Sequence, residues 1–252
     1  MRMLYPEADG DIDPVAAYSV DRPAPADRPW LLTNMIASVD GATALDGVSG
    51  GLGGDPDRAV FAAIREVADL ILVAGGTVRA ESYGPPKSSD DARARRVARG
   101  QAPDPRLAVV TASLNLDPAG DLFTGGGVTP LIITAAQAPA EPRRRLEDVA
   151  EVVTAGIERV DLAAALASLA DTADVVLSEG GPSLLGQLAT DDLIDELCLT
   201  LAPAIAGGSS KRFVHGAELD KLTGLDLAHV LESEGMLFLR YSRSAETGDG
   251  TD

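Results

Sequence analysis

Short apolar runs of strand length recur along the chain, and several of them are rich in β-branched residues. Such runs predict strands at residues 30–39, 69–75, 107–112, 130–134, 150–155, 174–179, 195–203, 225–233 and 236–243. The segments between them predict helices at residues 55–68, 89–99, 140–148, 161–171 and 183–190. In the first of these helices Val60, Phe61, Ile64 and Val67 fall on one face, as an amphipathic helix requires.

The order of these elements predicts the class of fold. Strands that alternate with helices indicate an α/β fold, with a mostly parallel sheet flanked by helices. The last two strands are joined at Glu234-Gly235, which adds an antiparallel C-terminal hairpin and makes the sheet mixed. Ligands of such sheets bind outside the carboxyl ends of the parallel strands, so we expect the site there.

One domain accounts for most of the chain. Residues 1–28 predict an extended N-terminal arm, residues 29–243 one domain, and residues 244–252 a disordered tail. No apolar run approaches the roughly 20 residues of a membrane span, and the N-terminus lacks the apolar middle of a signal peptide. We therefore expect a cytoplasmic protein, in which the single cysteine, Cys198, is a small core residue.

The charge limits the partners of the chain. With 21 basic and 39 acidic side chains the net charge is −18, which argues against nucleic acids and anionic membranes as partners. A small phosphorylated ligand stays possible, because a few local donors outweigh a distant field that salt screens. Only His215 and His229 are present, so we expect no metal site.

Two predicted strands end in glycine pairs, Gly75-Gly76 and Gly180-Gly181. Neither pair belongs to a G-x-G-x-x-G dinucleotide fingerprint. Both have the local pattern of an anion site, in which glycines let the backbone approach a ligand and free amides open a helix. A tight strand-to-helix turn without a ligand is the alternative. Because two such turns occur in one sheet, a diphosphate ligand that spans neighbouring strand ends is favoured over ligand-free turns.

The body of the chain also resembles a known family. The stretches "MIASVDGATA", "ADLILVAGGTVRAESYGP", "VVTAS", "LSEGGPSLLGQL" and "IDELCLTLAPAIAGG" occur in order over roughly 200 residues. They resemble motifs of the reductase family of riboflavin biosynthesis, the C-terminal half of the bifunctional deaminase–reductase. The resemblance implies a dihydrofolate-reductase-like fold, homodimers, and hydride transfer from NADPH to the sugar C1′ of a ribosylaminopyrimidine phosphate.

Matching positions imply roles for individual residues. Cofactor contacts are implied for Ile36, Ala37, Gly76, Thr77, Val78, Glu81, Thr111, Ser113, Gly180, Gly181, Pro182, Ser183, Leu184 and Leu185. Substrate contacts are implied for Asn34, Ser49, Arg65 and Glu179. Proton delivery is open among Asp40, Glu179 and water. On this basis we expect Gly181→Val to weaken NADPH binding severely while the fold survives.

Simpler interpretations of the same residues remain open. Asp40-Gly41 is typical of a turn, Arg65 could form a surface salt bridge, and the hydroxyls of Thr111 and Ser113 could satisfy strand-end backbone. The family's phosphate-contact stretch is replaced here by "ESYGPPKSSDDARARR", residues 81–96, in which a basic cluster begins. The cluster, a solvated helix face or a relocated phosphate site, contains Lys87, Arg93, Arg95, Arg96 and Arg99.

Other functions compete with this interpretation. The changed substrate loop keeps a dihydrofolate or other pterin reductase possible, and a non-catalytic nucleotide-binding module would also fit the glycine pairs. The stretch "GVSGG" at residues 47–51 fits a G-x-S-x-G serine nucleophile, but a strand should precede it and a helix should follow it directly. Neither is predicted there, which disfavours a serine hydrolase.

Overall fold

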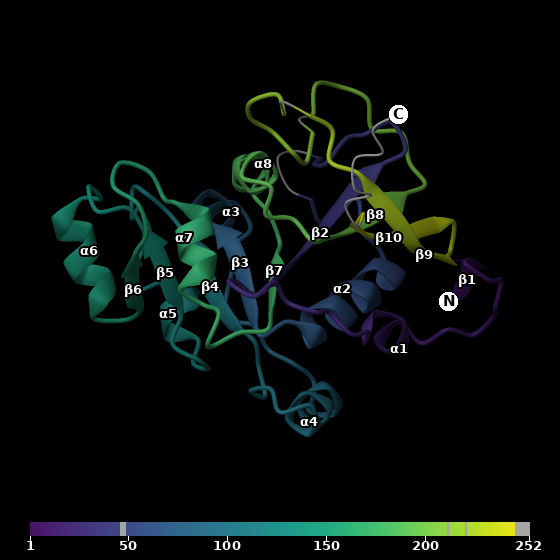
Figure 1. Ribbon diagram of the computed structural model, residues 1–252, viewed down its shortest axis with the longest axis horizontal. Helices are drawn as coiled ribbons and strands as arrows, with labels where there is room; N and C mark the ends of the chain where they lie inside the picture. Colours follow the sequence, from purple (N-terminus) through teal and green to yellow (C-terminus); the bar gives the residue numbers. More distant parts are fainter. Residues whose placement is uncertain (46–48, 211, 220, 245–252) are drawn as a thin grey trace, which may run out of the picture.

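The strands form one continuous sheet in a computed structural model that describes residues 1–45, 49–210, 212–219 and 221–244. The sheet runs in the order β1-β9-β10-β8-β2-β7-β3-β4-β5-β6, from the right to the left of Figure 1. The strands are β1 (Arg2–Tyr5), β2 (Trp30–Ser38), β3 (Leu70–Ala74), β4 (Arg106–Val110), β5 (Leu131–Thr134), β6 (Glu151–Thr154), β7 (Val175–Ser178), β8 (Glu196–Ala202), β9 (Leu225–Ser233) and β10 (Met236–Arg243).

Strand direction divides the sheet into two parts. From β8 to β6 every neighbouring pair is parallel, whereas β10, β9 and β1 add antiparallel pairs at the other edge. This arrangement confirms the predicted mixed, mostly parallel sheet with an antiparallel C-terminal hairpin. The predicted strand bounds are correct to within two residues.

Helices cover both faces of the sheet. They are α1 (Pro14–Tyr18), α2 (Asp55–Val67), α3 (Gly75–Ala80), α4 (Asp90–Ala98), α5 (Asp121–Thr124), α6 (Ala140–Glu147), α7 (Leu162–Ala167) and α8 (Pro182–Thr190). One apolar cluster joins the sheet to α1 and α2 through residues such as Tyr18 and Ile64. A second cluster joins the opposite face to α7 and α8 through residues such as Leu166 and Leu188. In Figure 1, α4 stands away from the sheet.

The N-terminal arm contains two elements that the sequence pattern did not indicate. Residues 2–5 pair with β9 as an antiparallel edge strand, and α1 packs beside α2. The strand β1 is mostly exposed and therefore shows no apolar alternation, and α1 is a single five-residue turn. The short helices α3 and α5 were missed as well, because four to six residues carry too little periodicity. Most of the expected tail, residues 245–252, lies outside the described residues.

No helix in the described part of the chain is long and apolar enough to cross a membrane. Within the same residues no group of three or more His, Cys, Asp or Glu side chains is arranged to hold a metal ion.

Candidate active site

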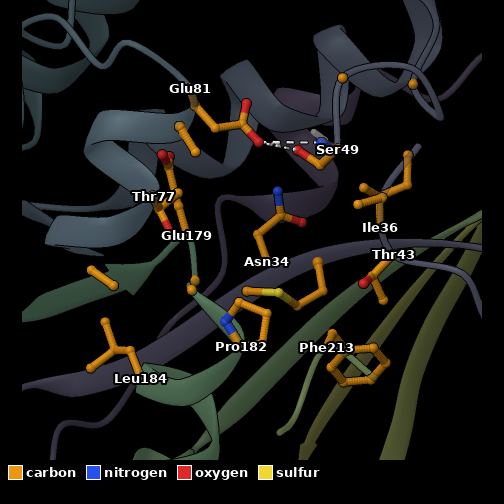
Figure 2. Close-up of a pocket in the computed structure, with 18 of the residues that line it drawn as sticks. Asn34, Ile36, Thr43, Ser49, Thr77, Glu81, Glu179, Pro182, Leu184 and Phe213 are labelled. Atoms are coloured by element: carbon orange, nitrogen blue, oxygen red, sulfur yellow. Dashed lines mark hydrogen bonds between the residues drawn. The ribbon is translucent and has the colours of Figure 1, made fainter. Parts of the chain in front are cut away.

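A cavity of about 740 Å³ opens where β2, β3 and β7 end. It lies at the carboxyl ends of parallel strands, the position expected for a ligand site in this class of sheet. Figure 2 shows Asn34 and Ile36 entering it from β2, Thr77 and Glu81 from α3 and its end, and Pro182 from α8. The predicted site residues that line it are Asn34, Ile36, Ser49, Gly76, Thr77, Glu81, Glu179, Gly180, Gly181, Pro182, Ser183 and Leu184.

Helix α8 begins at the cavity wall without a side-chain cap. Gly180 and Gly181 have φ angles of 95° and 79°, a left-handed conformation that glycine adopts at low cost. Pro182 then occupies the first turn, where its missing N–H is not needed. Because Gly181 caps the helix with no side-chain acceptor, the first-turn amides of Ser183 and Leu184 are available to an anion.

The same geometry corrects the expectation for Gly181→Val. A Cβ at Gly181 would lie 2.6 Å from the Cβ of Ala74 and 3.0 Å from the Thr77 Oγ1. The positive φ angle adds backbone strain to this clash. A valine would therefore distort the turn even without a ligand. This variant cannot separate loss of cofactor binding from loss of local structure.

Glu179, directly after β7, is held by two other side chains. Arg65 of α2 donates to both carboxylate oxygens, at 2.5 and 2.6 Å, and the Tyr83 hydroxyl donates to one of them at 2.8 Å. The Glu179 side chain is only 2% exposed. Burial lowers the pKa of Arg65, but its bonds to Glu179 outweigh this effect and raise it. Burial, together with the charge of Glu179, raises the pKa of Tyr83.

This cluster combines two of the earlier interpretations. Arg65 forms the salt bridge that was the alternative to substrate binding, yet the bridge is buried rather than on the surface. Arg65 also stacks 4.3 Å from the ring centre of Phe61 and does not itself line the cavity. Its charge reaches the site through Glu179, so its direct contact with substrate stays a prediction.

Two polar groups face each other across the cavity mouth. The backbone N–H and Oγ of Ser49 both donate to Glu81 Oε1, at 3.2 and 3.0 Å (Figure 2). Asn34 projects between the two walls, and its buried Oδ1 has no hydrogen-bond partner among the residues that the structure describes. Buried polar atoms are nearly always satisfied in native proteins, so an orphan beside a cavity indicates a missing ligand or water.

Several predicted site residues lie outside the cavity lining. Ala37, Val78 and Leu185 are buried in the core instead. The Thr111 hydroxyl accepts from the Leu114 N–H at 3.1 Å, and the Ser113 hydroxyl accepts from the N–H of Asn115. These two hydroxyls therefore satisfy loop backbone, which was the simpler interpretation. Any contact with a cofactor's adenosine end stays a prediction.

Asp40 is an exposed loop residue that does not reach the cavity lining. Its carboxylate accepts hydrogen bonds from the Ser38 hydroxyl and from the N–H groups of Ala206 and Gly207. These bonds, led by that of Ser38, lower the pKa of Asp40 to about 2. An acid of this strength holds no proton near neutral pH. The geometry favours a loop-anchoring role over the predicted catalytic one.

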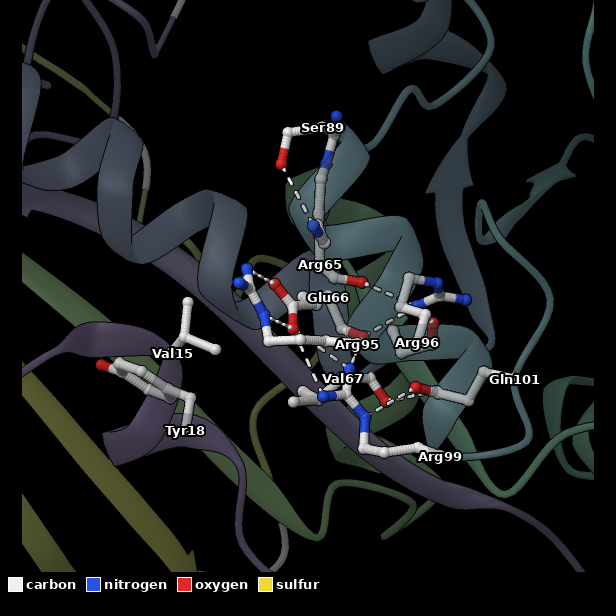
Figure 3. Close-up of polar contacts among 12 residues, drawn as sticks. Val15, Tyr18, Arg65, Glu66, Val67, Ser89, Arg95, Arg96, Arg99 and Gln101 are labelled. Atoms are coloured by element: carbon white, nitrogen blue, oxygen red, sulfur yellow. Dashed lines mark hydrogen bonds and ion pairs between the residues drawn. The ribbon is translucent and has the colours of Figure 1, made fainter.

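Three residues of the basic cluster, Arg95, Arg96 and Arg99, form a clamp between helices, and a phosphate site at the other two stays a prediction. Arg96 is fully buried and donates to the carbonyls of Glu66, Ala68 and Ala102 (Figure 3). Arg95 and Arg99 both pair with the buried Glu66 carboxylate. The remaining two are elsewhere on the surface: Arg93 pairs with Asp104, and Lys87 is exposed. The cluster therefore caps the C-terminal end of α2 and fixes α4 against it.

The serine-nucleophile alternative finds no support around Ser49. Residues 46–48 lie outside the described residues, and Ser49 itself sits in a loop. Its hydroxyl donates to Glu81 instead of to a histidine. Such a nucleophile needs a helix directly after it, but the next helix, α2, begins only at Asp55.

A family model described as the RibD C-terminal domain matches residues 29–238. The chain belongs to this family. The match begins just before β2 and ends within β10, so β1 and α1 precede the shared part.

Two curated relatives share most of their length with this member of the RibD C-terminal domain family. A protein of Methanothermobacter thermautotrophicus is 30% identical over 77% of this chain and 88% of its own length. One of Archaeoglobus fulgidus is 29% identical over 72% of this chain and 83% of its own. Both are named 2,5-diamino-6-ribosylamino-4(3H)-pyrimidinone 5′-phosphate reductase.

Solved structures agree on the fold. A pyrimidine reductase-like protein of Corynebacterium diphtheriae has a TM-score of 0.81 and 27% identity, covering 93% of this chain and all of that one. A dihydrofolate reductase of Enterococcus faecalis has a TM-score of 0.51 and 13% identity, covering 86% of this chain and 97% of that chain. The expected dihydrofolate-reductase-like fold is thereby confirmed.

The structure adds cavity residues that sequence reasoning missed. They are Thr43, Asp57, Arg58, Phe61, Tyr83 and Phe213, among others. Tyr83 lies in the stretch that departs from the family pattern, and Phe213 comes from a loop far along the chain. Asp57 and Phe61 belong to α2, for which the sequence pattern predicted an apolar face but no role in the site. A carboxylate in the first helical turn is common for dipole reasons, so it gave no separate signal.

Proposed function

We propose that this member of the RibD C-terminal domain family is an NADPH-dependent reductase of a ribosylaminopyrimidine 5′-phosphate. The observation that carries the proposal is the uncapped start of α8, which opens on the same cavity as Asn34 and Glu179. The end of the cavity at the start of α8 thus suits a diphosphate, and the end with Asn34 and Glu179 suits a polar heterocycle. The names of the two curated relatives, both pyrimidinone phosphate reductases, support the substrate class.

The cavity residues fit a dinucleotide. A volume of about 740 Å³ falls within the range of cofactor pockets, roughly 300–1,000 Å³. The free amides of Ser183 and Leu184 would hold the diphosphate, with the Thr77 hydroxyl on the opposite wall. A nicotinamide cofactor would supply the hydride. The protein aligns donor and acceptor, an effect that needs no strong acid or base of its own.

The substrate end of the cavity offers hydrogen-bonding groups and one exposed cation. The orphan Oδ1 of Asn34 would accept a bond from the pyrimidine, beside the neutralised Glu179–Arg65 pair. Arg58 lines the cavity, and its side chain is 72% exposed; within the described residues its ion pair is with the exposed Asp55. Such surface pairs are weak. Arg58 is therefore available to a substrate phosphate. The homodimer stays a prediction.

Cofactor binding is tested first, at Ser183. Ser183→Glu places a carboxylate in the first turn of α8, where it stabilises the helix but repels a diphosphate. We expect NADPH to bind at least about tenfold more weakly, because like charges about 4 Å apart near a surface repel by more than 1.4 kcal/mol. Ser183→Gln is the neutral control of equal size. Fluorescence titration with NADPH measures both, and equal affinities in the two variants would count against the diphosphate position.

Turnover then separates the competing functions. NADPH oxidation is followed with the pyrimidinone 5′-phosphate named for the relatives and, in parallel, with dihydrofolate. The proposal expects oxidation with the pyrimidinone. Activity on dihydrofolate alone would replace it with a pterin reductase. NADPH binding without oxidation of either compound would indicate a non-catalytic nucleotide-binding module.

A further inference from the structure

Three carboxylates line the cavity among the residues that the structure describes, and their partners differ. Glu179 is bound by Arg65 and Tyr83, and Glu81 accepts two bonds from Ser49. Asp57 is half-buried and has no ion pair in the described part of the chain. The hydroxyl of Thr200, a buried residue of β8, interacts with its carboxylate and lowers the pKa of Asp57. Among the described residues Asp57 and Glu81 are thus the cavity carboxylates without a bound arginine, and of these two Glu81 is exposed whereas Asp57 is half-buried.

The position of Asp57 is set by three elements. It lies in the first turn of α2, and its partner Thr200 stands opposite Ile36 in the β2–β8 register. Ile36 lines the cavity (Figure 2), and the family resemblance implies that it contacts the nicotinamide end of the cofactor. A Cβ at Gly53 would lie 2.6 Å from Asp57 Oδ2, so the preceding loop has no side chain where the carboxylate reaches over it. The carboxylate therefore borders the end where the reacting carbons would meet.

The surroundings of Asp57 favour its protonated form. Burial raises its pKa, although the Thr200 hydroxyl and the positive charge of Arg58 both lower it. Arg58 shares helix α2, whereas the other ionisable groups that line the cavity are Glu81, Glu179 and Tyr83. A cofactor and substrate that displace water from this cavity would raise the pKa further. This trend is the one required of a proton donor near neutral pH.

We propose that Asp57 is the catalytic acid of this site, delivering a proton to the ring oxygen O4′ of the substrate sugar. The inference rests on the proposed function. The hydride from the nicotinamide C4 forms the new C1′–H bond, and the C1′–O4′ bond breaks. O4′ takes the electron pair of that bond and the proton of Asp57. The products are the ribitylamine, the oxidised cofactor and the Asp57 carboxylate, which water reprotonates.

The two acids considered from the sequence are poorer donors. Asp40 lies outside the cavity and has a pKa of about 2. Both oxygens of Glu179 are engaged with the guanidinium of Arg65. The Tyr83 hydroxyl also donates to one of them, so the carboxylate of Glu179 is held by its neighbours and is not free to turn toward the sugar.

Asp57→Asn tests the assignment. We expect kcat to fall by about a hundredfold or more, the usual range for loss of a general acid, while the Kd for NADPH stays unchanged. Wild-type kcat should decline as the pH rises, because Asp57 must be protonated, and the variant should lose this decline. Asp55→Asn is the matched control two residues away. Asp55 is 87% exposed and outside the cavity lining, so this variant should keep the wild-type kcat and pH profile.

The possible outcomes are distinct. Absence of wild-type turnover on the pyrimidinone would overturn the proposed function, and this inference with it. Turnover that Asp57→Asn retains within about threefold, with NADPH still bound, would overturn this inference alone. If Asp57→Asn does not fold, Thr200→Val decides the matter. Loss of the hydroxyl raises the pKa of Asp57, so the decline of kcat should move to higher pH, and an unmoved decline would refute the assignment.

Discussion

Glu196 and Glu179 both have buried side chains held by arginines, but of these two only Glu179 lines the cavity. Glu196 has a fully buried side chain bound by Arg22 and Arg240, with the Trp30 indole N–H at 3.2 Å. Glu179 is 2% exposed and has the single cation Arg65, which is itself 28% exposed. The first cluster is closed to solvent, whereas the second borders an open site.

The difference lies in what each ion pair holds in place. Arg22 comes from the N-terminal arm, and it joins the arm to the first residue of β8 across the sheet. Glu196 with two arginines leaves a net positive charge in the core, whereas Glu179 with one arginine is balanced. The Glu196 cluster therefore serves stability. The Glu179 cluster presents a neutral polar wall to a ligand, at a smaller cost in desolvation because Arg65 keeps access to water.

Glu196→Gln is expected to have the largest effect on stability. The substitution keeps the shape of the side chain but leaves two buried arginines without a counter-charge. Breaking a buried pair in this way costs about 3–5 kcal/mol. Urea unfolding followed by circular dichroism measures the loss. Glu151→Gln is the matched control, because its pair with Arg106 is 56% and 29% exposed and should contribute at most about 1 kcal/mol. Equal losses in both variants would contradict the contrast between closed and open clusters.

The closed cluster also predicts how stability depends on acid. Burial, followed by the charge of Arg240, lowers the pKa of His229 to about 4, and in the described part of the chain its Nε2 has no hydrogen-bond partner. The unfolded chain protonates this histidine near pH 6.5, before the folded protein does. Stability should therefore be complete above pH 6.5 and fall by about 3 kcal/mol as the pH drops toward 4.

His229→Phe checks this acid dependence. A phenyl ring can keep the edge-to-face contact with Tyr18, whose ring centre lies 5.0 Å from that of His229. We expect the variant to match the wild type at neutral pH and to lose less stability between pH 6.5 and 4. Urea unfolding at several pH values is the measurement. Parallel pH curves for both proteins would show that other groups cause the loss, such as Glu196, whose bound arginines lower its pKa despite burial.

The parallel part of the fold was predictable because its signals are local. The run "LILVA" is apolar throughout, and β3 is indeed buried on both faces. In contrast, β1 is mostly exposed, and its place is fixed by pairing with β9 more than 220 residues away. The helix predicted over residues 161–171 shows the limit of periodicity. Asp161 caps its start as a side-chain acceptor, but α7 ends at Ala167.

The site was predictable only in its backbone. Gly180-Gly181 predicted the turn before α8, because a left-handed backbone and the close approach of the chain to Ala74 both require glycine. The partners of Glu179 were not predictable, since Arg65 lies 114 positions away and Tyr83 lies in a stretch without a family counterpart. The pairing of Asp57 with Thr200 depends likewise on the fold, which brings α2 against β8.

Glu179→Gln should cost less stability than Glu196→Gln and so sharpens the comparison between the two clusters. Arg65 is partly exposed, so water compensates part of its lost counter-charge, and the Tyr83 hydroxyl can still donate to the amide oxygen. We expect a loss of about 1.5–3 kcal/mol, as for a hydrogen bond to a charged group, measured by the same urea unfolding. Catalysis should respond more strongly, because a freed Arg65 guanidinium beside the cavity would attract the substrate phosphate into the wrong place. A loss of stability as large as that of Glu196→Gln would mean that the cavity wall is as closed to water as the core.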